Sequence, residues 1–296
     1  MTIEDIAEFR ERPIAVFDSG LGGLTVVREL SRVLPGEDFL YLGDTARVPY
    51  GIKSLAIVRR FSLEITSFLL GLKPKMVVVA CNTATAAAID AVEQLSPVEV
   101  VDVIRPGAAA ALEATAGPIG VIATEATVGS KAYERAILAH DPKRVVVQVA
   151  CPLLVPIVEE GRSEDDPIVL AVLSDYLREL QRVLQRPGYD TTASPITGAL
   201  ILGCTHYPLL HGAISKLMGP SVPLVSSARA AALEVQRRLY LTGHHSTRSY
   251  GGRLRCFTTD NPDRFIRLGE RFGGRRIDEV QHVRTDVLEA QKLPVQ

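Results

Sequence analysis

The chain has 296 residues, of which 47% are hydrophobic and 23% are charged, and its formal net charge is −1. This length can form one large or two ordinary domains, and the balanced charge gives no global indication of a nucleic acid or an anionic membrane as a partner. No apolar run approaches the ~20 residues of a membrane span, and the first segment, MTIEDIAEFRERP, lacks the apolar core of a signal peptide. We therefore expect a cytoplasmic protein with reduced cysteines and a flexible N-terminal extension over residues 1–12.

Short apolar runs alternate with helical patterns along most of the chain. Those of the first half are IAVF (14–17), FLYLG (39–43), MVVVA (76–80) and VEVVDVI (98–104). A second series contains IGVIAT (119–124), RVVVQVA (144–150), GALILGC (198–204) and VPLVSS (222–227), and the last precedes a predicted helix over Ala228–Leu241. Strands that alternate with helices predict an α/β protein with mostly parallel sheets, and continuous apolar strands indicate that both faces of each sheet are covered.

The two halves of the chain repeat a pattern of strand ends. One strand of the first half ends in FDSGLGG and a later one in ACNT; in the second half the ends are IATEAT and GCTH. This indicates an internal duplication into two similar three-layer α/β lobes. We expect lobe A over residues 13–107 and 225–283, lobe B over 108–224, and a C-terminal tail over 284–296. Because open α/β sheets bind ligands at the carboxyl ends of their strands, we expect the active site in the cleft between the lobes.

Two of the four cysteines occupy equivalent strand ends, one in each lobe. Cys81 and Cys204 each precede a predicted helix, where backbone N–H groups and the helix dipole are expected to lower a thiol pKa. The ordinary alternative is a buried core cysteine, which is our interpretation of Cys151 and Cys256. Two thiols across a closed cleft could remove a proton from a carbon and return one to its opposite face, which inverts a stereocentre.

Other polar residues at the strand ends are open to more than one interpretation. Asp18 and Ser19 could cap a helix or contact a ligand, and the following GLGG does not fit a nucleotide-binding fingerprint. His206 could orient or deprotonate a group beside Cys204; a zinc site with a distant cysteine is conceivable, but C-x-H alone is a weak signal. The stretch 237–276 holds ten arginines against three acids, and we interpret it as a solvated face.

Six motifs carry a resemblance to a known family: VFDSGLGGLTV, YLGDTARVPYG, ACNTATA, ATEAT, CPLLVPIVEEG and GCTHYPLL. Between Ile14 and Val283 the chain resembles the cofactor-independent glutamate racemases of the aspartate/glutamate racemase superfamily. The resemblance implies interconversion of L- and D-glutamate without cofactor or metal, supply of D-glutamate for peptidoglycan, and a homodimer. It departs at Ser226, where Asp is common, in the expected crossover between the lobes.

The resemblance also implies roles for individual residues. Cys81 and Cys204 match the two catalytic acid/bases, Asp18 and His206 the groups that assist them and contact the substrate, and Glu159 a further acidic site residue. The positions that hold the substrate amino and carboxylate groups are Ser19, Asn82, Thr83, Thr124, Thr127 and Thr205, and those that line its pocket are Tyr50 and Gly51.

Three alternatives remain open on the sequence. The first is a racemase for aspartate or another amino acid, with the same cysteine pair and a different pocket. The second is a two-lobed binding module, which accounts for a cleft but gives no reason for paired cysteines. The third is a regulatory protein that binds, for example, a topoisomerase, and no feature of the sequence points to it.

Overall fold

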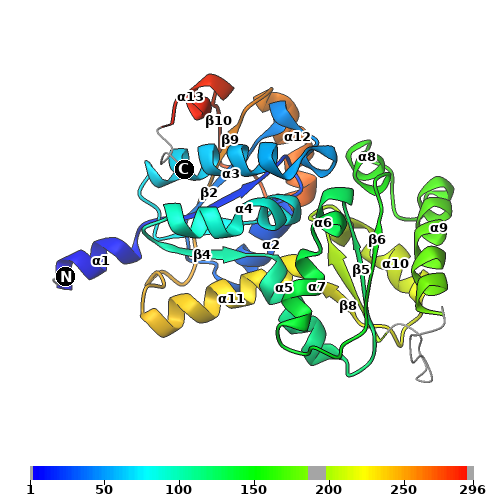
Figure 1. Cartoon of the computed structure of the whole chain (residues 1–296). Helices are drawn as coiled ribbons and strands as arrows, with labels where there is room; N and C mark the ends of the chain where they lie inside the picture. Colours follow the sequence, from blue (N-terminus) through cyan, green and yellow to red (C-terminus); the bar gives the residue numbers. More distant parts are fainter. Residues whose placement is uncertain (1–2, 186–197, 292–296) are drawn as a thin grey trace.

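The chain forms two parallel β-sheets, each covered by helices on both faces, as the alternating pattern predicts (Figure 1). The structure is a computed structural model, and it describes residues 3–185 and 198–291. Residues 1–2 of the predicted extension, 292–296 of the predicted tail and 186–197 of predicted lobe B lie outside the described residues. No helix within the described ranges combines the length and the apolar character needed to cross a bilayer.

The larger sheet has six parallel strands in the order β10-β9-β2-β1-β3-β4. Its strands are β1 (Ile14–Asp18), β2 (Phe39–Gly43), β3 (Met76–Val79), β4 (Glu99–Asp102), β9 (Leu254–Thr258) and β10 (Glu279–His282). Alternate residues of β1 face opposite layers: Ile14 and Val16 pack in one hydrophobic cluster, and Ala15 and Phe17 in another. We call this sheet, with the helices that pack on it, the large lobe.

The smaller sheet has four parallel strands in the order β6-β5-β7-β8. Its strands are β5 (Ile119–Ala123), β6 (Val146–Ala150), β7 (Ala199–Gly203) and β8 (Leu224–Ser226). Ile122 faces one hydrophobic cluster, whereas Val121 faces another that it shares with the helices α5 (Ile104–Ala114) and α7 (Ala132–Leu138). We call this sheet, with the helices that pack on it, the small lobe.

The order β6-β5-β7-β8 repeats the order β2-β1-β3-β4 of the larger sheet. Cys81 follows β3 and Cys204 follows β7, so the two cysteines occupy equivalent places in the two lobes. The repeated strand ends of the sequence therefore correspond to a repeated topology. Strands β9 and β10 have no counterpart among the described residues of the small lobe.

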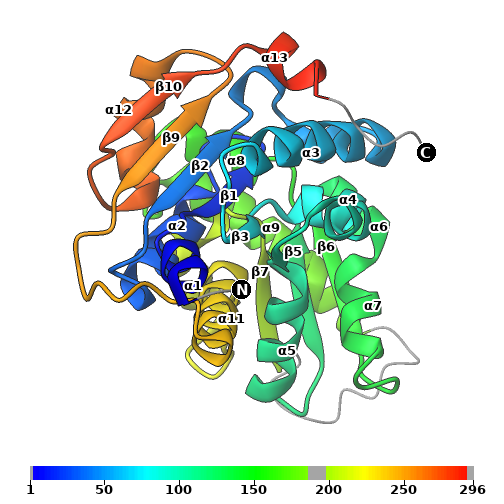
Figure 2. The ribbon, with the colours of Figure 1, turned by 90° about the vertical axis from the view of Figure 1, so that its left-hand side faces the viewer.

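The helices fill the layers above and below the sheets (Figures 1 and 2). Those of the large lobe are α2 (Leu24–Val33), α3 (Leu55–Leu70), α4 (Asn82–Leu95), α11 (Ser227–Thr242), α12 (Pro262–Gly273) and α13 (Thr285–Glu289). Those of the small lobe are α5 (Ile104–Ala114), α6 (Glu125–Ser130), α7 (Ala132–Leu138), α8 (Leu154–Glu159), α9 (Pro167–Leu184) and α10 (His211–Met218). Short 3₁₀ helices are η1 (Thr45–Arg47), η2 (Tyr50–Ile52) and η3 (Tyr207–Leu210).

Helix α11 connects the two lobes. It packs against α2 of the large lobe and against α5 of the small lobe, and its bounds agree closely with the helix predicted over Ala228–Leu241. Ser226 ends β8, and its hydroxyl accepts a hydrogen bond from the backbone N–H of Arg229 at 3.3 Å. This residue, where the family pattern commonly has Asp, therefore caps the connecting helix.

The two ends of the chain contain helices where the sequence predicts an extension and a tail. Helix α1 (Ile3–Arg10) projects from the large lobe, and its last residue contacts the C-terminal end of α11: Arg10 Nε donates to the carbonyl of Gly243 at 2.6 Å (Figure 1). Buried Lys75 donates to the carbonyl of Arg10 at 2.5 Å. At the other end, α13 packs on α3 and buries Leu288. Specific contacts thus attach both segments to the large lobe.

Candidate active site

A cavity of about 410 Å³ lies between the two lobes, and both thiols line it. Residues from both lobes form its wall, including all of the predicted site residues except two. The predicted residues on the wall are Ser19, Tyr50, Gly51, Cys81, Asn82, Thr83, Thr124, Glu159, Cys204, Thr205 and His206. The other two, Asp18 and Thr127, are fully buried and support residues of the wall.

Cys81 is the N-cap residue of α4 and is almost completely buried. Its Sγ accepts a hydrogen bond from the backbone N–H of Ala84 at 3.4 Å and donates to Ser19 Oγ at 3.8 Å. The sequence predicts a lowered pKa at this helix start, and that prediction is wrong. Burial, together with the negative charge of Asp18, raises the pKa of the Cys81 thiol and outweighs the backbone donors. At neutral pH Cys81 is therefore a thiol, which can donate a proton.

Asp18 ends β1 and holds the glycine-rich turn that leads into α2. Its Oδ2 accepts hydrogen bonds from the backbone N–H groups of Gly20 at 3.2 Å and Gly23 at 2.9 Å. Its Oδ1 is buried and has no hydrogen-bond partner among the described residues. Asp18 thus stabilises the turn, as the capping interpretation holds, and keeps one acceptor beside Cys81.

Cys204 belongs to a chain of three ionisable groups. Its Sγ lies 3.8 Å from Nδ1 of His206, and Nε2 of His206 lies 3.0 Å from Oε1 of Glu159. Burial lowers the pKa of His206, but the hydrogen bonds to Cys204 and Glu159 outweigh it and raise the pKa to about 10. The hydrogen bond from His206 lowers the pKa of Glu159 against the effect of burial. His206 is therefore an imidazolium, a cation that stabilises negative charge on the neighbouring sulfur.

The two sulfur environments are thus opposite in character. Cys81 lies beside a carboxylate and holds its proton, whereas Cys204 lies beside a cation. One proton donor and one potential base on the same cavity are what a reaction with two acid/base groups requires.

Hydroxyl and amide groups line the rest of the cavity. Oγ1 of Thr124 lies 2.9 Å from Oγ1 of Thr83 and 2.9 Å from Oγ1 of Thr127, which joins α4 of the large lobe to the start of α6 in the small lobe. Asn82 accepts from the hydroxyl of Tyr133 at 2.7 Å, and its buried Nδ2 has no partner among the described residues. These donors suit the carboxylate groups of a small ligand.

A buried network fixes the part of the wall formed by η2. The hydroxyl of Tyr50 donates to Asp44, which also accepts from Arg47 Nε at 2.7 Å and from Thr259 Oγ1 at 3.0 Å. Burial and the charge of Asp44 raise the pKa of Tyr50 well above its usual value, so the phenol stays protonated. Sequence reasoning selected Tyr50 but missed Asp44 and Arg47. One signal in the sequence could have found them: Asp44 and Arg47 are oppositely charged, three residues apart, and lie in the loop before Tyr50.

The lobes meet closely beside Cys204. Thr25 Oγ1 of the large lobe donates to the carbonyl of Thr205 at 2.9 Å. A Cβ atom added to Gly22 would lie only 2.2 Å from Oγ1 of Thr205 and 2.5 Å from the ring of His206. The turn Gly20–Gly23 is therefore in direct contact with the strand end that carries the second thiol.

Changing Glu159 to Gln is expected to lower the pKa of His206, because the mutation removes the carboxylate that stabilises the imidazolium. Because the pKa of His206 is higher in the folded than in the unfolded chain, its protonation stabilises the fold. This stabilisation is fully present below pH about 6.5, the pKa of histidine in the unfolded chain, and is lost as the pH rises to about 10. The stability advantage of the wild type over the variant should therefore shrink across that window. Histidine-ring NMR and urea unfolding measure the two effects, with Glu160→Gln as the neighbouring control. An unchanged His206 titration would contradict the assigned contact.

Similarity to known proteins agrees with this geometry. The family model described as Asp/Glu/Hydantoin racemase matches residues 19–235. The chain is 45% identical over 284 residues to a glutamate racemase of Geobacter metallireducens, covering 95% of this chain and 98% of that protein. It is 47% identical over 277 residues to a glutamate racemase of Thermus thermophilus, with 93% and 98% covered.

Solved structures resemble the fold over nearly the whole chain. Glutamate racemase isoform RacE1 of Bacillus anthracis has a TM-score of 0.84 at 38% identity and covers 93% of this chain and 98% of its own. Glutamate racemase of Francisella tularensis, in complex with D-glutamate, has a TM-score of 0.83 at 35% identity, with 94% and 99% covered. On the extent of these matches, the chain belongs to the Asp/Glu/hydantoin racemase family.

Proposed function

We propose that the protein is a glutamate racemase that interconverts L- and D-glutamate by proton transfer at Cα between Cys81 and Cys204. The observation that carries the proposal is the placement of the two thiols at equivalent strand ends of two lobes, on the wall of one cavity. The relatives that match nearly the whole chain are glutamate racemases, which supports glutamate as the substrate.

The two sulfur atoms divide the reaction. With His206 as an imidazolium beside it, Cys204 as the thiolate removes the Cα proton from one face of the substrate and becomes a thiol. The Cys81 thiol gives its proton to the opposite face and becomes the thiolate, so one C–H bond breaks, one forms and the configuration inverts. The other enantiomer uses the same atoms with the roles exchanged. Asp18 assists at Cys81, and Glu159 assists through His206.

The polar wall holds the substrate between the thiols. The carboxylates can accept from the hydroxyls of Ser19, Thr83, Thr124 and Thr205, which Thr127 supports. They can also accept from Nδ2 of Asn82, which has no partner among the described residues. Asp18 lies behind the wall beside Ser19, and its buried Oδ1, which has no hydrogen-bond partner among the described residues, suits an ammonium group. Tyr50 and Gly51 form part of the wall on the side of the large lobe. Fixing the Cα–H bond against a base in a closed cavity provides the orientation that the reaction needs.

The family resemblance extends the proposal to the setting of the reaction. The enzyme acts in the cytoplasm without cofactor, supplies D-glutamate for peptidoglycan, and forms a homodimer. In the described parts of the chain, no group of three or more His, Cys, Asp or Glu side chains is arranged to hold a metal ion.

Proton NMR of L-glutamate in D₂O, with chelator and without added cofactor, tests the proposal. We expect the Cα–H signal and the optical rotation to disappear together, because each turnover exchanges the proton and inverts the centre. L-Aspartate in a parallel sample is expected to react far more slowly. Faster exchange of aspartate would replace the substrate assignment. If neither amino acid exchanged with folded protein, the two-thiol assignment would be rejected in favour of a binding module.

A further inference from the structure

Helix α12 of the large lobe reaches across to the group that holds Cys204. The ring of Phe272 packs edge-on against the ring of His206, with 5.3 Å between centroids. Arg271 donates to the carbonyls of Val158 at 3.4 Å and Arg162 at 3.1 Å, just where α8 ends. One helix of the opposite lobe thus contacts both the histidine and the segment that carries Glu159.

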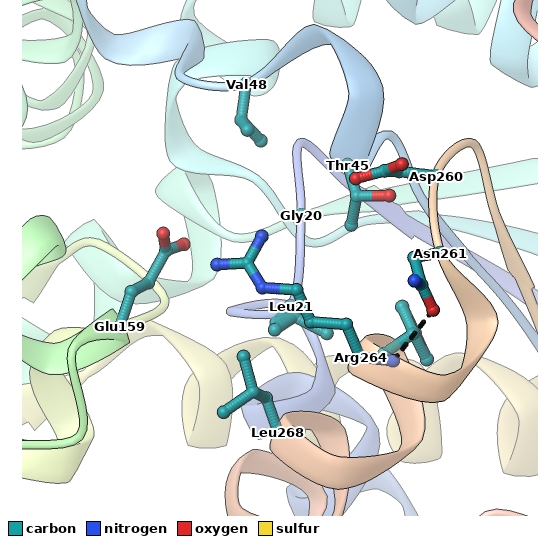
Figure 3. A pocket seen from close by; sticks show the side chains of 10 residues that line it. Gly20, Leu21, Thr45, Val48, Glu159, Asp260, Asn261, Arg264 and Leu268 are labelled. Carbon is teal, nitrogen blue, oxygen red and sulfur yellow. Dashed lines mark hydrogen bonds between the residues drawn. The ribbon is translucent and has the colours of Figure 1, made fainter.

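Arg264 lies on the first turn of α12, and its positive charge acts on Glu159. Both residues line the main cavity and also an adjoining cavity of about 30 Å³, and the guanidinium points toward the Glu159 carboxylate (Figure 3). Among residues 3–185 and 198–291, no side chain forms a hydrogen bond or ion pair with this guanidinium. Other arginines of the same stretch do have partners: Arg237 and Arg238 pair with Glu234, and Arg275 pairs with Asp278.

The charges on the cavity wall explain why a cation is needed there. Three carboxylates line it, Glu125, Glu159 and Glu160, whereas Arg264 is the only lysine or arginine on the wall within the part of the chain that the structure describes. Glu159 is half-buried, and burial opposes its ionised form. After the hydrogen bond and charge of His206, the charge of Arg264 is what lowers the pKa of Glu159 further.

We propose that Arg264 is a positioning residue for the reaction: its cation keeps Glu159 ionised and directed at His206, and thereby keeps the imidazolium beside Cys204. The inference rests on the proposed roles of Glu159, His206 and Cys204. Because Arg264 belongs to the large lobe and Glu159 to the small lobe, the interaction exists only when the lobes are closed around the cavity. Closure therefore adds to the charge stabilisation that His206 gives to Glu159.

Three variants test the proposal: Arg264→Gln, Arg264→Lys, and Arg267→Gln as a charge-matched control on the same helix, exposed and outside both cavities. We expect Arg264→Gln to lower kcat severalfold with little change in KM, and to move the acid limb of the kcat/KM profile to higher pH. The carboxyl ¹³C signal of Glu159, assigned with Glu159→Gln, should titrate at higher pH in the same variant. Arg264→Lys should keep kcat, the pH profile and the Glu159 titration close to those of the wild type. Arg267→Gln should change none of the three.

Two outcomes would overturn the inference. A raised KM with an unchanged Glu159 titration would mean that Arg264 binds the substrate directly. An unchanged profile and titration would mean that Arg264 is an ordinary solvated charge. Because the ¹³C titration needs no turnover, it remains informative even if the proposed function fails, and the two failures are distinguishable.

Discussion

Replacing Cys81 or Cys204 by serine lowers racemisation of glutamate by about 10²–10⁴-fold, which is the usual contribution of a positioned acid/base group. The hydroxyl has nearly the size of the thiol but holds its proton much more tightly, so it cannot exchange protons with carbon at a useful rate. Polarimetry with each enantiomer measures the loss. Cys256→Ser serves as the control because Cys256 is buried in β9 and does not line the cavity.

The two serine variants should also differ from each other in isotope exchange. Each variant keeps one thiol. That thiol can still remove the Cα proton from the enantiomer whose Cα–H bond faces it. We therefore expect slow deuterium exchange without inversion, for one enantiomer in Cys81→Ser and for the other in Cys204→Ser. Equal exchange of both enantiomers in one variant would show that a single group reaches both faces, and would remove the basis for two thiols.

Changing Gly22 to Ala is expected to lower kcat/KM by about 10²-fold, although Gly22 makes no contact that chemistry requires. The new Cβ would overlap Oγ1 of Thr205 and the ring of His206, so the lobes must separate or the ring must move. A displacement of about 1 Å at a reacting group has a cost of this size.

The matched control for this change is Gly129→Ala in α6, where an added Cβ meets no atom within 4 Å. Steady-state kinetics and thermal unfolding of both variants separate a loss of alignment from a loss of fold. A fully active Gly22→Ala protein would mean that the contact between the lobes is loose enough to absorb a methyl group, contrary to the structure.

The sequence predicts the parts of the fold whose strands are continuous apolar runs. Both sheets and the equivalence of Cys81 and Cys204 follow from such runs, because a strand buried on both faces has few polar positions. Strands β9 and β10 were not predicted: Arg255 interrupts the first, and the second, EVQH, is a largely exposed edge strand. Strand β9 pairs with β2, which is distant in sequence, and β10 pairs only with β9 among the described strands.

The site residues also divide into those that local sequence predicts and those that depend on contacts of the folded chain. Residues next to strand ends could be selected from the sequence, because parallel strands bring their carboxyl ends to one edge. The raised pKa of Cys81 could not, since it depends on how deeply the thiol is buried and on its distance from Asp18. Asp44 and Arg264 were missed for a related reason: each acts on a selected residue through a contact that only the folded chain creates.

The repeated strand order has a consequence for ancestry. Two copies of a four-stranded unit, joined head to tail, are the product expected from duplication of a half-length gene. The ancestor would then have been a symmetric dimer of half-length chains, in which each subunit gave one identical thiol to a site on the twofold axis. Under duplication, the differences between the halves follow the fusion: β9, α12 and β10 on one side, and His206 with Glu159 on the other. Fusion into a single chain allowed the two sulfur atoms to acquire different surroundings, which identical subunits cannot do.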